Sequence, residues 1–164
     1  MPSRTTLLEK IVHEAAQDLA AAYGLDVPCT SDTDDEQLAA IIGFTSPGYR
    51  GSLVVSIPQR VLEQIRAPGT TAALSDWTAE LSNQLLGRVK NRLLLHGPAI
   101  NIALPVSIAG NALRIGAVED PRALRSELKA GALRVIVNVL FDVGFEFTPS
   151  HGEAPAEPGD LVLF

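Results

Sequence analysis

Apolar residues recur at helical spacing in the first part of the chain. They lie on one side of a helical wheel and comprise Leu7, Leu8, Ile11, Val12, Ala15, Leu19 and Ala22. Thr6 and Glu9 have the spacing of a capping box, and Gly24 is typical of a helix C-terminus. The pattern therefore predicts an amphipathic helix that starts near Thr6 and stops at Gly24.

Two strand-like runs follow, Gln37–Thr45 and Ser52–Ile57, and the turn-rich stretch "SPGYRG" connects them. This arrangement predicts a β-hairpin. Pro58 then begins a short helix that carries Val61, Leu62 and Ile65, because proline is tolerated in the first turn of a helix.

A long helix is predicted from about Ser75 to Leu95, with Ser75 as its N-cap and Gly97 after its end. Its apolar residues gather into one stripe, which consists of Leu81, Leu85, Leu86, Val89 and Leu93. An amphipathic stripe of this kind is expected to face the core.

The rest of the chain is mostly β-prone. Alternating apolar residues predict strands at Ala99–Leu104 and Leu113–Ala117, and Asp120–Lys129 is interpreted as a short helical piece. The run Ala132–Phe147 predicts strands that bend into a hairpin at Asp142–Gly144.

The order of these elements predicts an α/β or α+β sandwich with long helices packed on one side of an antiparallel-rich sheet. The order helix-strand-strand-helix occurs twice, which suggests a duplicated unit. We expect one domain over residues 1–149. Residues 150–164 are rich in Pro, Gly and Glu and predict a flexible tail. Its apolar end, Leu161–Phe164, either folds back or docks on a partner.

Composition narrows the class of protein. The chain has 164 residues, of which 46% are hydrophobic and 20% charged, as in a globular domain. The net charge of −6 argues against nucleic acid as a partner, because binding phosphates requires clustered Lys and Arg. No apolar run reaches the roughly 18 residues of a spanning helix. We therefore expect a cytoplasmic protein without membrane insertion. No spacing among Cys29, His13, His96 and His151 suggests a metal site.

The long helix also has a polar face. Asp76, Glu80, Asn83 and Gly87 fall together opposite the apolar stripe, since each residue turns the helix by about 100°. A glycine inside a helix costs roughly 1 kcal/mol relative to alanine, and it lets another backbone approach closely. These residues predict a docking face. Spacing alone is also compatible with an ordinary solvated face, and Asp76 suits the positive end of the helix dipole.

The pattern D-x-x-x-E-x-x-N-x-x-x-G resembles the CheC/CheX/FliY chemotaxis phosphatases, and single-site CheX is the most similar type. The preceding segment "GYRGSLVVSIP" and the following "PVSIAG", Pro105 to Gly110, extend the resemblance. It covers roughly Gln37 to Gly110 well and the final β-run loosely.

The resemblance implies an enzyme that hydrolyses the aspartyl phosphate of a CheY-like response regulator. In that interpretation Glu80 docks the lysine of the regulator and Asn83 orients the attacking water, while Asp76 and Gly87 belong to the docking face. The chain itself binds no cofactor, because the regulator supplies Mg²⁺. A non-catalytic adaptor that binds response regulators or motor-switch components on the same fold is the alternative, and an unrelated α/β module is a third possibility.

The first helix contains residues that partly repeat the motif of the long helix. Glu14 and Gln17 have the spacing of the Glu and Asn of the motif, but Gln replaces Asn and Ala21 occupies the glycine position, so we interpret them as ordinary surface.

The β-run Ala132–Phe147 would leave a bare sheet edge, and such edges pair with other chains. CheX-like proteins form strand-mediated homodimers, so we expect a homodimer here as well.

Overall fold

The computed structural model describes residues 2–29, 35–66, 73–116 and 119–149. Its elements, in chain order, are α1 (Arg4–Ala22), β1 (Gln37–Ser46), β2 (Tyr49–Pro58), α2 (Gln59–Ile65), α3 (Leu74–Leu93), β3 (Asn101–Ile102), β4 (Val106–Gly110), β5 (Ala123–Ala130) and β6 (Leu133–Phe141). The predicted tail, including Leu161–Phe164, lies outside the described residues.

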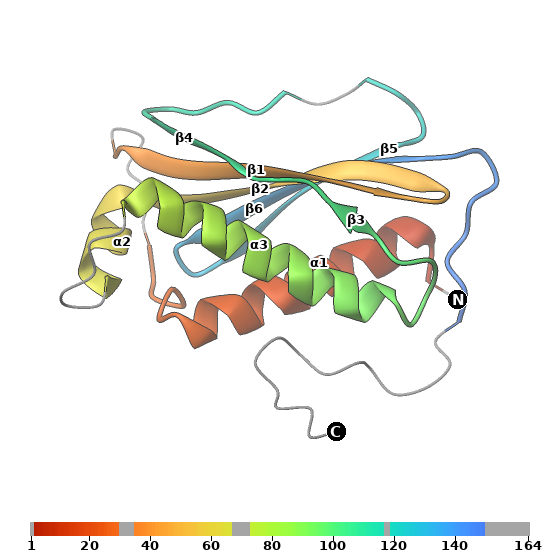
Figure 1. Ribbon diagram of the computed structural model, residues 1–164, viewed down its shortest axis with the longest axis horizontal. Coiled ribbons are helices and arrows are strands. Elements are labelled where there is room, and N and C mark those ends of the chain that lie inside the picture. The colour runs from red at the N-terminus through yellow and green to blue at the C-terminus, as the bar shows by residue number, and fades with distance from the viewer. Residues whose placement is uncertain (1, 30–34, 67–72, 117–118, 150–164) are drawn as a thin grey trace.

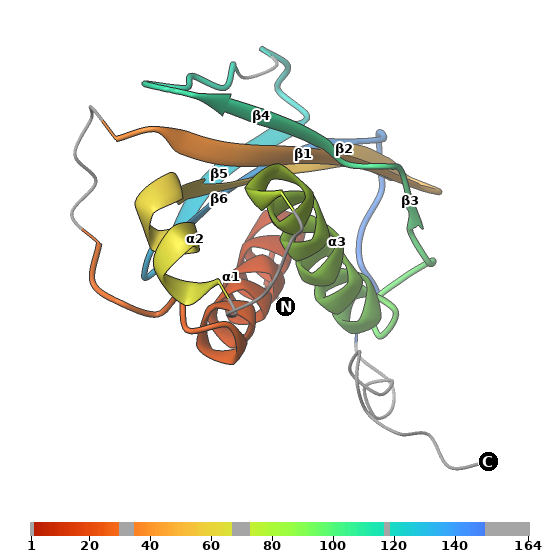
Figure 2. The same cartoon turned by 60° about the vertical axis from the view of Figure 1, so that its left-hand side comes forward.

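The strands form one antiparallel sheet of six strands in this part of the chain. Its order is β3-β1-β2-β6-β5, and β4 pairs with β1 beside β3. All three helices lie on the same face of the sheet, with α1 and α3 side by side beneath it (Figures 1 and 2). Residues 111–116, which follow β4, lie over the opposite face. The predicted α+β fold, with helices packed on one side of an antiparallel sheet, is confirmed.

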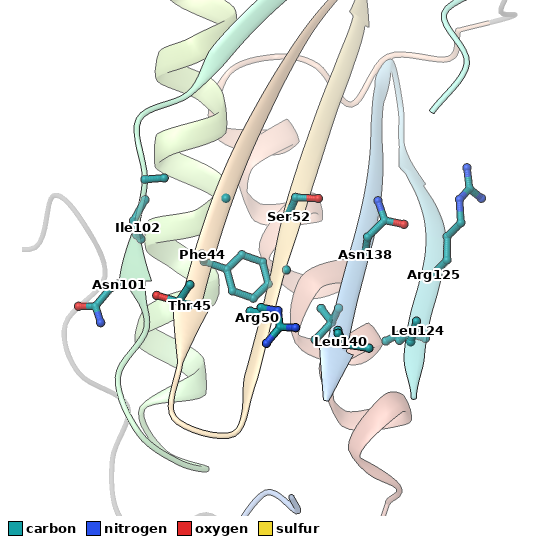
Figure 3. Close-up of a pocket in the computed structure, with 15 residues that line it drawn as sticks. Phe44, Thr45, Arg50, Ser52, Asn101, Ile102, Leu124, Arg125, Asn138 and Leu140 are labelled. Atoms are coloured by element: carbon teal, nitrogen blue, oxygen red, sulfur yellow. The ribbon is translucent and has the colours of Figure 1, made fainter. Parts of the chain in front are cut away.

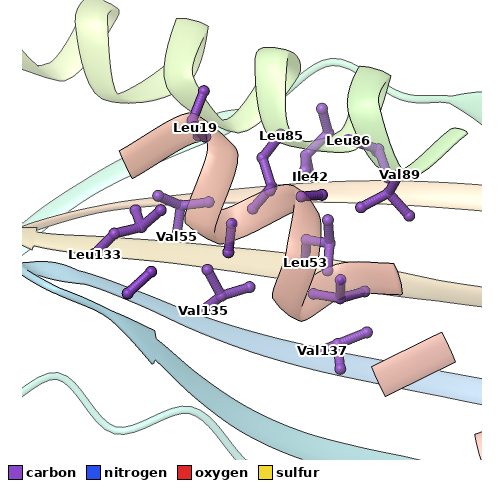
Figure 4. Packing of buried hydrophobic residues seen from close by; sticks show 14 of the residues in the cluster. Leu19, Ile42, Leu53, Val55, Leu85, Leu86, Val89, Leu133, Val135 and Val137 are labelled. Carbon is purple, nitrogen blue, oxygen red and sulfur yellow. The ribbon is translucent and has the colours of Figure 1, made fainter. Parts of the chain in front are cut away.

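The main core lies between the sheet and the helices. Alternate residues of β1, β2 and β6 point toward α1 and α3, among them Ile42, Leu53, Val55, Val135 and Val137 (Figure 4). The predicted stripe of α3 is buried in full, at Leu81, Leu85, Leu86, Val89 and Leu93. Burial of a leucine side chain stabilises the fold by about 1.5–3 kcal/mol. This packing therefore holds α3 in a fixed orientation on the sheet.

The predicted first hairpin is confirmed, with longer strands than expected. β1 and β2 pair from Gln37↔Pro58 to Ser46↔Tyr49, so the connection is only Pro47-Gly48. Gly48 has a φ of +97°, a backbone conformation that favours glycine. A Cβ atom at this position would also lie 2.1 Å from the ring of Phe145.

Both long helices begin earlier than predicted. The N-cap of α1 is Ser3, whose Oγ accepts a hydrogen bond from the Thr6 N–H at 3.2 Å, so Thr6 lies inside the helix. Ala73 is the N-cap of α3, without a side-chain hydrogen bond, and Ser75 is already helical. The predicted C-terminal stop is confirmed, because Gly24 adopts a φ of +69° directly after the C-cap of α1.

The predicted helix at Asp120–Lys129 is wrong, because this segment contains strand β5. Leu124, Leu128 and Ala130 face the core, while Glu127 and its neighbours on the other side of the pleat face outward. Pairing with β6 along its full length overrides the high helix propensity of Leu, Glu and Lys. The helix-strand-strand-helix order therefore does not occur twice, and the suggested duplication loses its basis.

The predicted hairpin at Asp142–Gly144 is also wrong. β6 ends at Phe141, and residues 142–149 return along the end of the β1–β2 hairpin without forming a strand (Figure 1). Phe145 and Phe147 pack on Tyr49, with ring centroids 5.1 Å and 5.4 Å away. Aromatic packing thus replaces strand pairing in this segment.

Two other strand predictions need correction. Ala99–Leu104 forms only the short β3, and the longer strand is β4 at Val106–Gly110. Leu113 and Ile115, expected in a strand, instead pack on the outer face of the sheet. β6 lies between β2 and β5, so the predicted bare edge at Ala132–Phe147 does not exist. The outermost strands among the described residues are β5 and β3 with β4.

Candidate active site

The four polar-face residues of α3 lie on the side of the helix that faces away from the sheet core. Asp76 and Glu80 are exposed, whereas Asn83 and Gly87 are half-buried. Residues at i and i+3 or i+4 are neighbours on a helix surface, so Glu80 lies one turn from both Asp76 and Asn83. The helix therefore presents a carboxylate and a carboxamide together, as the spacing predicted.

The buried side of α3 also contains two small polar residues, Thr78 and Ser82. The Thr78 hydroxyl donates to the carbonyl of Leu74 at 2.8 Å, and the Ser82 hydroxyl donates to the carbonyl of Ala79 at 2.7 Å. Each hydroxyl is thus satisfied within its own helix and needs no partner in the core. Because these two hydrogen bonds are made within the helix, the side of α3 that contains Thr78 and Ser82 can pack against the core. The four polar-face residues remain on the opposite side.

The start of α3 is fixed from two directions. Ser107 of β4 donates a hydrogen bond to the carbonyl of Ser75 at 2.8 Å. Trp77, which lies beside the apolar stripe of the helix, packs against the main core. Asp76 lies in the first turn, where a carboxylate interacts favourably with the helix dipole. The docking role that the sequence suggested for Asp76 remains a prediction.

Glu80 and Asn83 differ in their hydrogen bonding. Gln84 donates to Glu80, with 3.0 Å between Nε2 and Oε1. The side chain of Asn83 has no hydrogen bond with any residue that the structure describes. A glutamate offers two acceptor oxygens, and a carboxamide offers both donors and an acceptor. The pair can therefore accept hydrogen bonds from a cation and orient a water at adjacent points of the surface.

Sequence reasoning did not single out Gln84. The available signal was its spacing, because residues four apart on a helix lie within reach of each other. Its contact orients the Glu80 carboxylate before any partner binds.

Glu14 and Gln17 of α1, which partly repeat the motif, lie on an ordinary helix surface. Glu14, Gln17 and Ala21 are exposed, and Glu14 forms an i,i+4 ion pair with Lys10 at 3.8 Å. Exposed pairs of this kind contribute only about 0.3–0.5 kcal/mol.

Two other kinds of feature are absent from the described residues. No group of three or more His, Cys, Asp or Glu side chains is arranged to hold a metal ion. None of the described helices is both long and apolar enough to cross a membrane.

No protein-family model and no curated protein sequence matches the chain. Among solved structures, the chemotaxis protein CheX from Vibrio vulnificus is 15% identical, with a TM-score of 0.62 over 86% of this chain and 100% of that chain. A chemotactic CheC-like protein from Shewanella oneidensis is 18% identical, with a TM-score of 0.59 over 81% and 96%.

CheX from Desulfovibrio desulfuricans is similar to the same degree, with a TM-score of 0.60 at 16% identity over 83% of this chain and 99% of that chain. These likenesses extend over 81–86% of the chain, and at identities of 15–18% they establish the fold. The chain therefore has the fold of the CheX and CheC-like chemotaxis proteins, and the resemblance seen in its sequence is confirmed at the level of the fold.

Proposed function

We propose that this protein is a phosphatase that hydrolyses the aspartyl phosphate of a CheY-like response regulator. The observation that carries the proposal is the placement of the exposed Glu80 and the half-buried Asn83 on one face of α3, within the fold of the CheX proteins. A helix held by its whole apolar stripe offers a rigid platform for both side chains.

Hydrolysis of the aspartyl phosphate requires few catalytic groups from the phosphatase itself. Water attacks the phosphorus in line with the bond to the aspartyl oxygen, that bond breaks, and the products are inorganic phosphate and a free carboxylate. Such transfers depend mainly on positioning and charge stabilisation. The regulator would supply Mg²⁺ and a lysine next to its phosphoryl group, so the partner protein need add only an oriented water.

Asn83 suits this role because its carboxamide is neutral and has no competing hydrogen bond among the described residues. It can accept a hydrogen bond from the attacking water without repelling the phosphate. Glu80 would accept hydrogen bonds from the lysine of the regulator, and its exposure allows that approach. Charge-assisted hydrogen bonds of this kind are roughly twice as strong as neutral ones.

Gly87 would form the neighbouring part of the docking face. It lies one turn beyond Asn83, where the lack of a side chain lets a loop of the regulator come close. Asp76, one turn before Glu80, would lie at the edge of the same contact.

The test is a dephosphorylation assay with purified components. A candidate regulator is phosphorylated with a small-molecule donor in the presence of Mg²⁺, and phosphate loss is followed with and without this protein. We expect phosphate loss at least about tenfold faster than spontaneous decay, which corresponds to about 1.4 kcal/mol of barrier. Tight binding of the phosphorylated regulator without faster decay would instead identify the adaptor function.

A further inference from the structure

The face of the sheet away from the helices is covered over only part of its length. Residues 111–116 cross it, and Leu113 and Ile115 pack there on a small second core of Ala39, Val54 and Ile136. Beyond this crossing, toward the β1–β2 turn, the same face is open. Figure 3 shows this open region, with the helices lying behind the strands.

The open region is a hollow of about 590 Å³. Pockets that hold small organic ligands usually measure about 300–1,000 Å³, so its size is suitable. Its floor is a row of residues that pair directly across the strands, Gly43↔Ser52, Ser52↔Asn138 and Asn138↔Arg125. Ala103 extends the row at its outer end, where its N–H bonds to the Gly43 carbonyl. One end of the floor is thus flat and formed by small side chains, and the other end is polar and cationic.

The charges of the hollow have one sign. Arg50 and Arg125 are the charged side chains that line it, and no Asp or Glu does so among the described residues. Arg125 donates to the carbonyl of Ile115 at 3.1 Å, which fixes its position beside the floor. The nearby Glu127 carboxylate is held by Arg134 through two hydrogen bonds, at 2.6 Å and 3.0 Å. In a chain with a net charge of −6, this local cationic site favours an anion.

A polar atom in the same floor lacks a partner. Oδ1 of Asn138 is buried and accepts no hydrogen bond from the described residues. A buried acceptor without a partner costs about 1–3 kcal/mol, so native proteins usually provide one. Oδ1 is shielded from the hollow as the amide now lies, and rotation of the amide would exchange it with Nδ2 and present it to an N–H or O–H group of a ligand.

We propose that this hollow binds a small organic anion with a flat apolar body and an N–H or O–H donor. The body would lie on Gly43 and Ala103, the anionic group would contact Arg50 and Arg125, and the donor would reach Asn138. The hollow is on the opposite face of the sheet from Glu80 and Asn83, so this site is separate from the proposed phosphatase site.

The test uses 8-anilinonaphthalene-1-sulfonate, which combines a fused aromatic ring, a sulfonate and one N–H. Fluorescence titration of the full chain should give saturable 1:1 binding, and Arg50→Gln combined with Arg125→Gln should weaken it at least about tenfold. N-phenyl-1-naphthylamine has the same rings and N–H but no charge, and it should bind at least about tenfold more weakly than the sulfonate.

Two further variants separate this site from general apolar binding. Ser52→Ile should abolish the signal by filling the floor, with the fold checked by circular dichroism and thermal unfolding. Leu104→Ser removes a side chain that is 89% exposed outside the hollow and should leave the signal unchanged. The proposal is overturned if no saturable binding occurs below about 1 mM. It is equally overturned if the arginine variants bind like the wild type or if Leu104→Ser abolishes binding.

Discussion

Gln84 donates a hydrogen bond to Glu80 across one turn of α3, while Asn83, the residue next to Gln84, has no hydrogen-bond partner among the described residues. The two amides therefore have different surroundings on the same helix. Gln84 acts on the orientation of a carboxylate, and Asn83 keeps its donors and acceptor available for water or phosphate. This difference allows the proposed catalytic amide to be tested against a neighbour of the same chemistry.

Asn83→Ala should reduce assisted dephosphorylation at least about tenfold, because the variant can no longer orient water at the phosphorus. Gln84→Ala is the matched control, since it removes an amide that orients Glu80 and is not assigned to the water. We expect it to weaken binding of the regulator while the rate at saturating regulator stays within about twofold of wild type. Both variants should unfold at the wild-type temperature. Wild-type activity in a folded Asn83→Ala protein would rule out the proposed mechanism.

Glu80→Ala should weaken binding of the phosphorylated regulator, because the lysine of the regulator loses its acceptor. We expect a Kd at least about fivefold higher, measured by calorimetry with a stable phosphoryl analogue on the regulator. Gly87→Leu should weaken binding as well, since it places a branched side chain on the docking face. If both variants bind like the wild type, the exposed face of α3 is not the docking face.

The predicted homodimer should use the edge formed by β3 and β4. Ile102, Leu104, Val106 and Ile108 are large apolar residues of this region that remain exposed. The opposite edge strand, β5, alternates exposed charged residues, which discourage strand pairing. Val106→Lys should therefore shift the protein to a monomer in light scattering at micromolar concentration. A wild-type protein that is already monomeric there would contradict the expectation.

Gly51→Ala should destabilise the fold, whereas Gly43→Ala on the paired strand should not. A Cβ atom at Gly51 would lie 2.2 Å from the carbonyl oxygen of Asn138 and 2.9 Å from the ring of Phe44. At Gly43 the nearest atom would be the Ala103 Cβ, at an ordinary 3.7 Å. We expect a loss of about 1–3 kcal/mol in the free energy of unfolding for Gly51→Ala. For Gly43→Ala we expect a change within about 0.5 kcal/mol, and chemical denaturation measures both.

Asp120 should contribute to stability only above strongly acidic pH. Hydrogen bonds from the Arg122 side chain and backbone N–H lower the pKa of the Asp120 carboxyl from 3.8 to about 2. Because the pKa is lower in the folded state, the contribution is full above the unfolded value and disappears as the pH falls through about 2. The difference in unfolding temperature between the wild type and Asp120→Asn should therefore shrink between about pH 5 and pH 2. A difference that stays constant over this range would show that the ion pair does not contribute.

Local patterns in the sequence determined the helices, the first hairpin and the polar face of α3. The stripe of Leu81, Leu85 and Val89 has the period of a helix, so burying it leaves Glu80 and Asn83 outside whatever the stripe packs against. Pro47-Gly48 between two apolar runs likewise specifies a turn through backbone preferences alone. These features depend on residues a few positions apart, which is why they could be predicted without the fold.

The tertiary structure alone decided the C-terminal half. The residues of β5 have good helix propensity, but their alternation of Leu124, Ser126 and Leu128 with Arg125, Glu127 and Lys129 fits the pleat of a strand beside β6. Phe145 and Phe147 could have formed a strand, yet Tyr49 and Phe141 offer them a larger apolar contact. The row from Gly43 to Arg125 exists only through the register of four strands. In each case the deciding free energy comes from contacts between residues far apart in the chain, which local propensity does not contain.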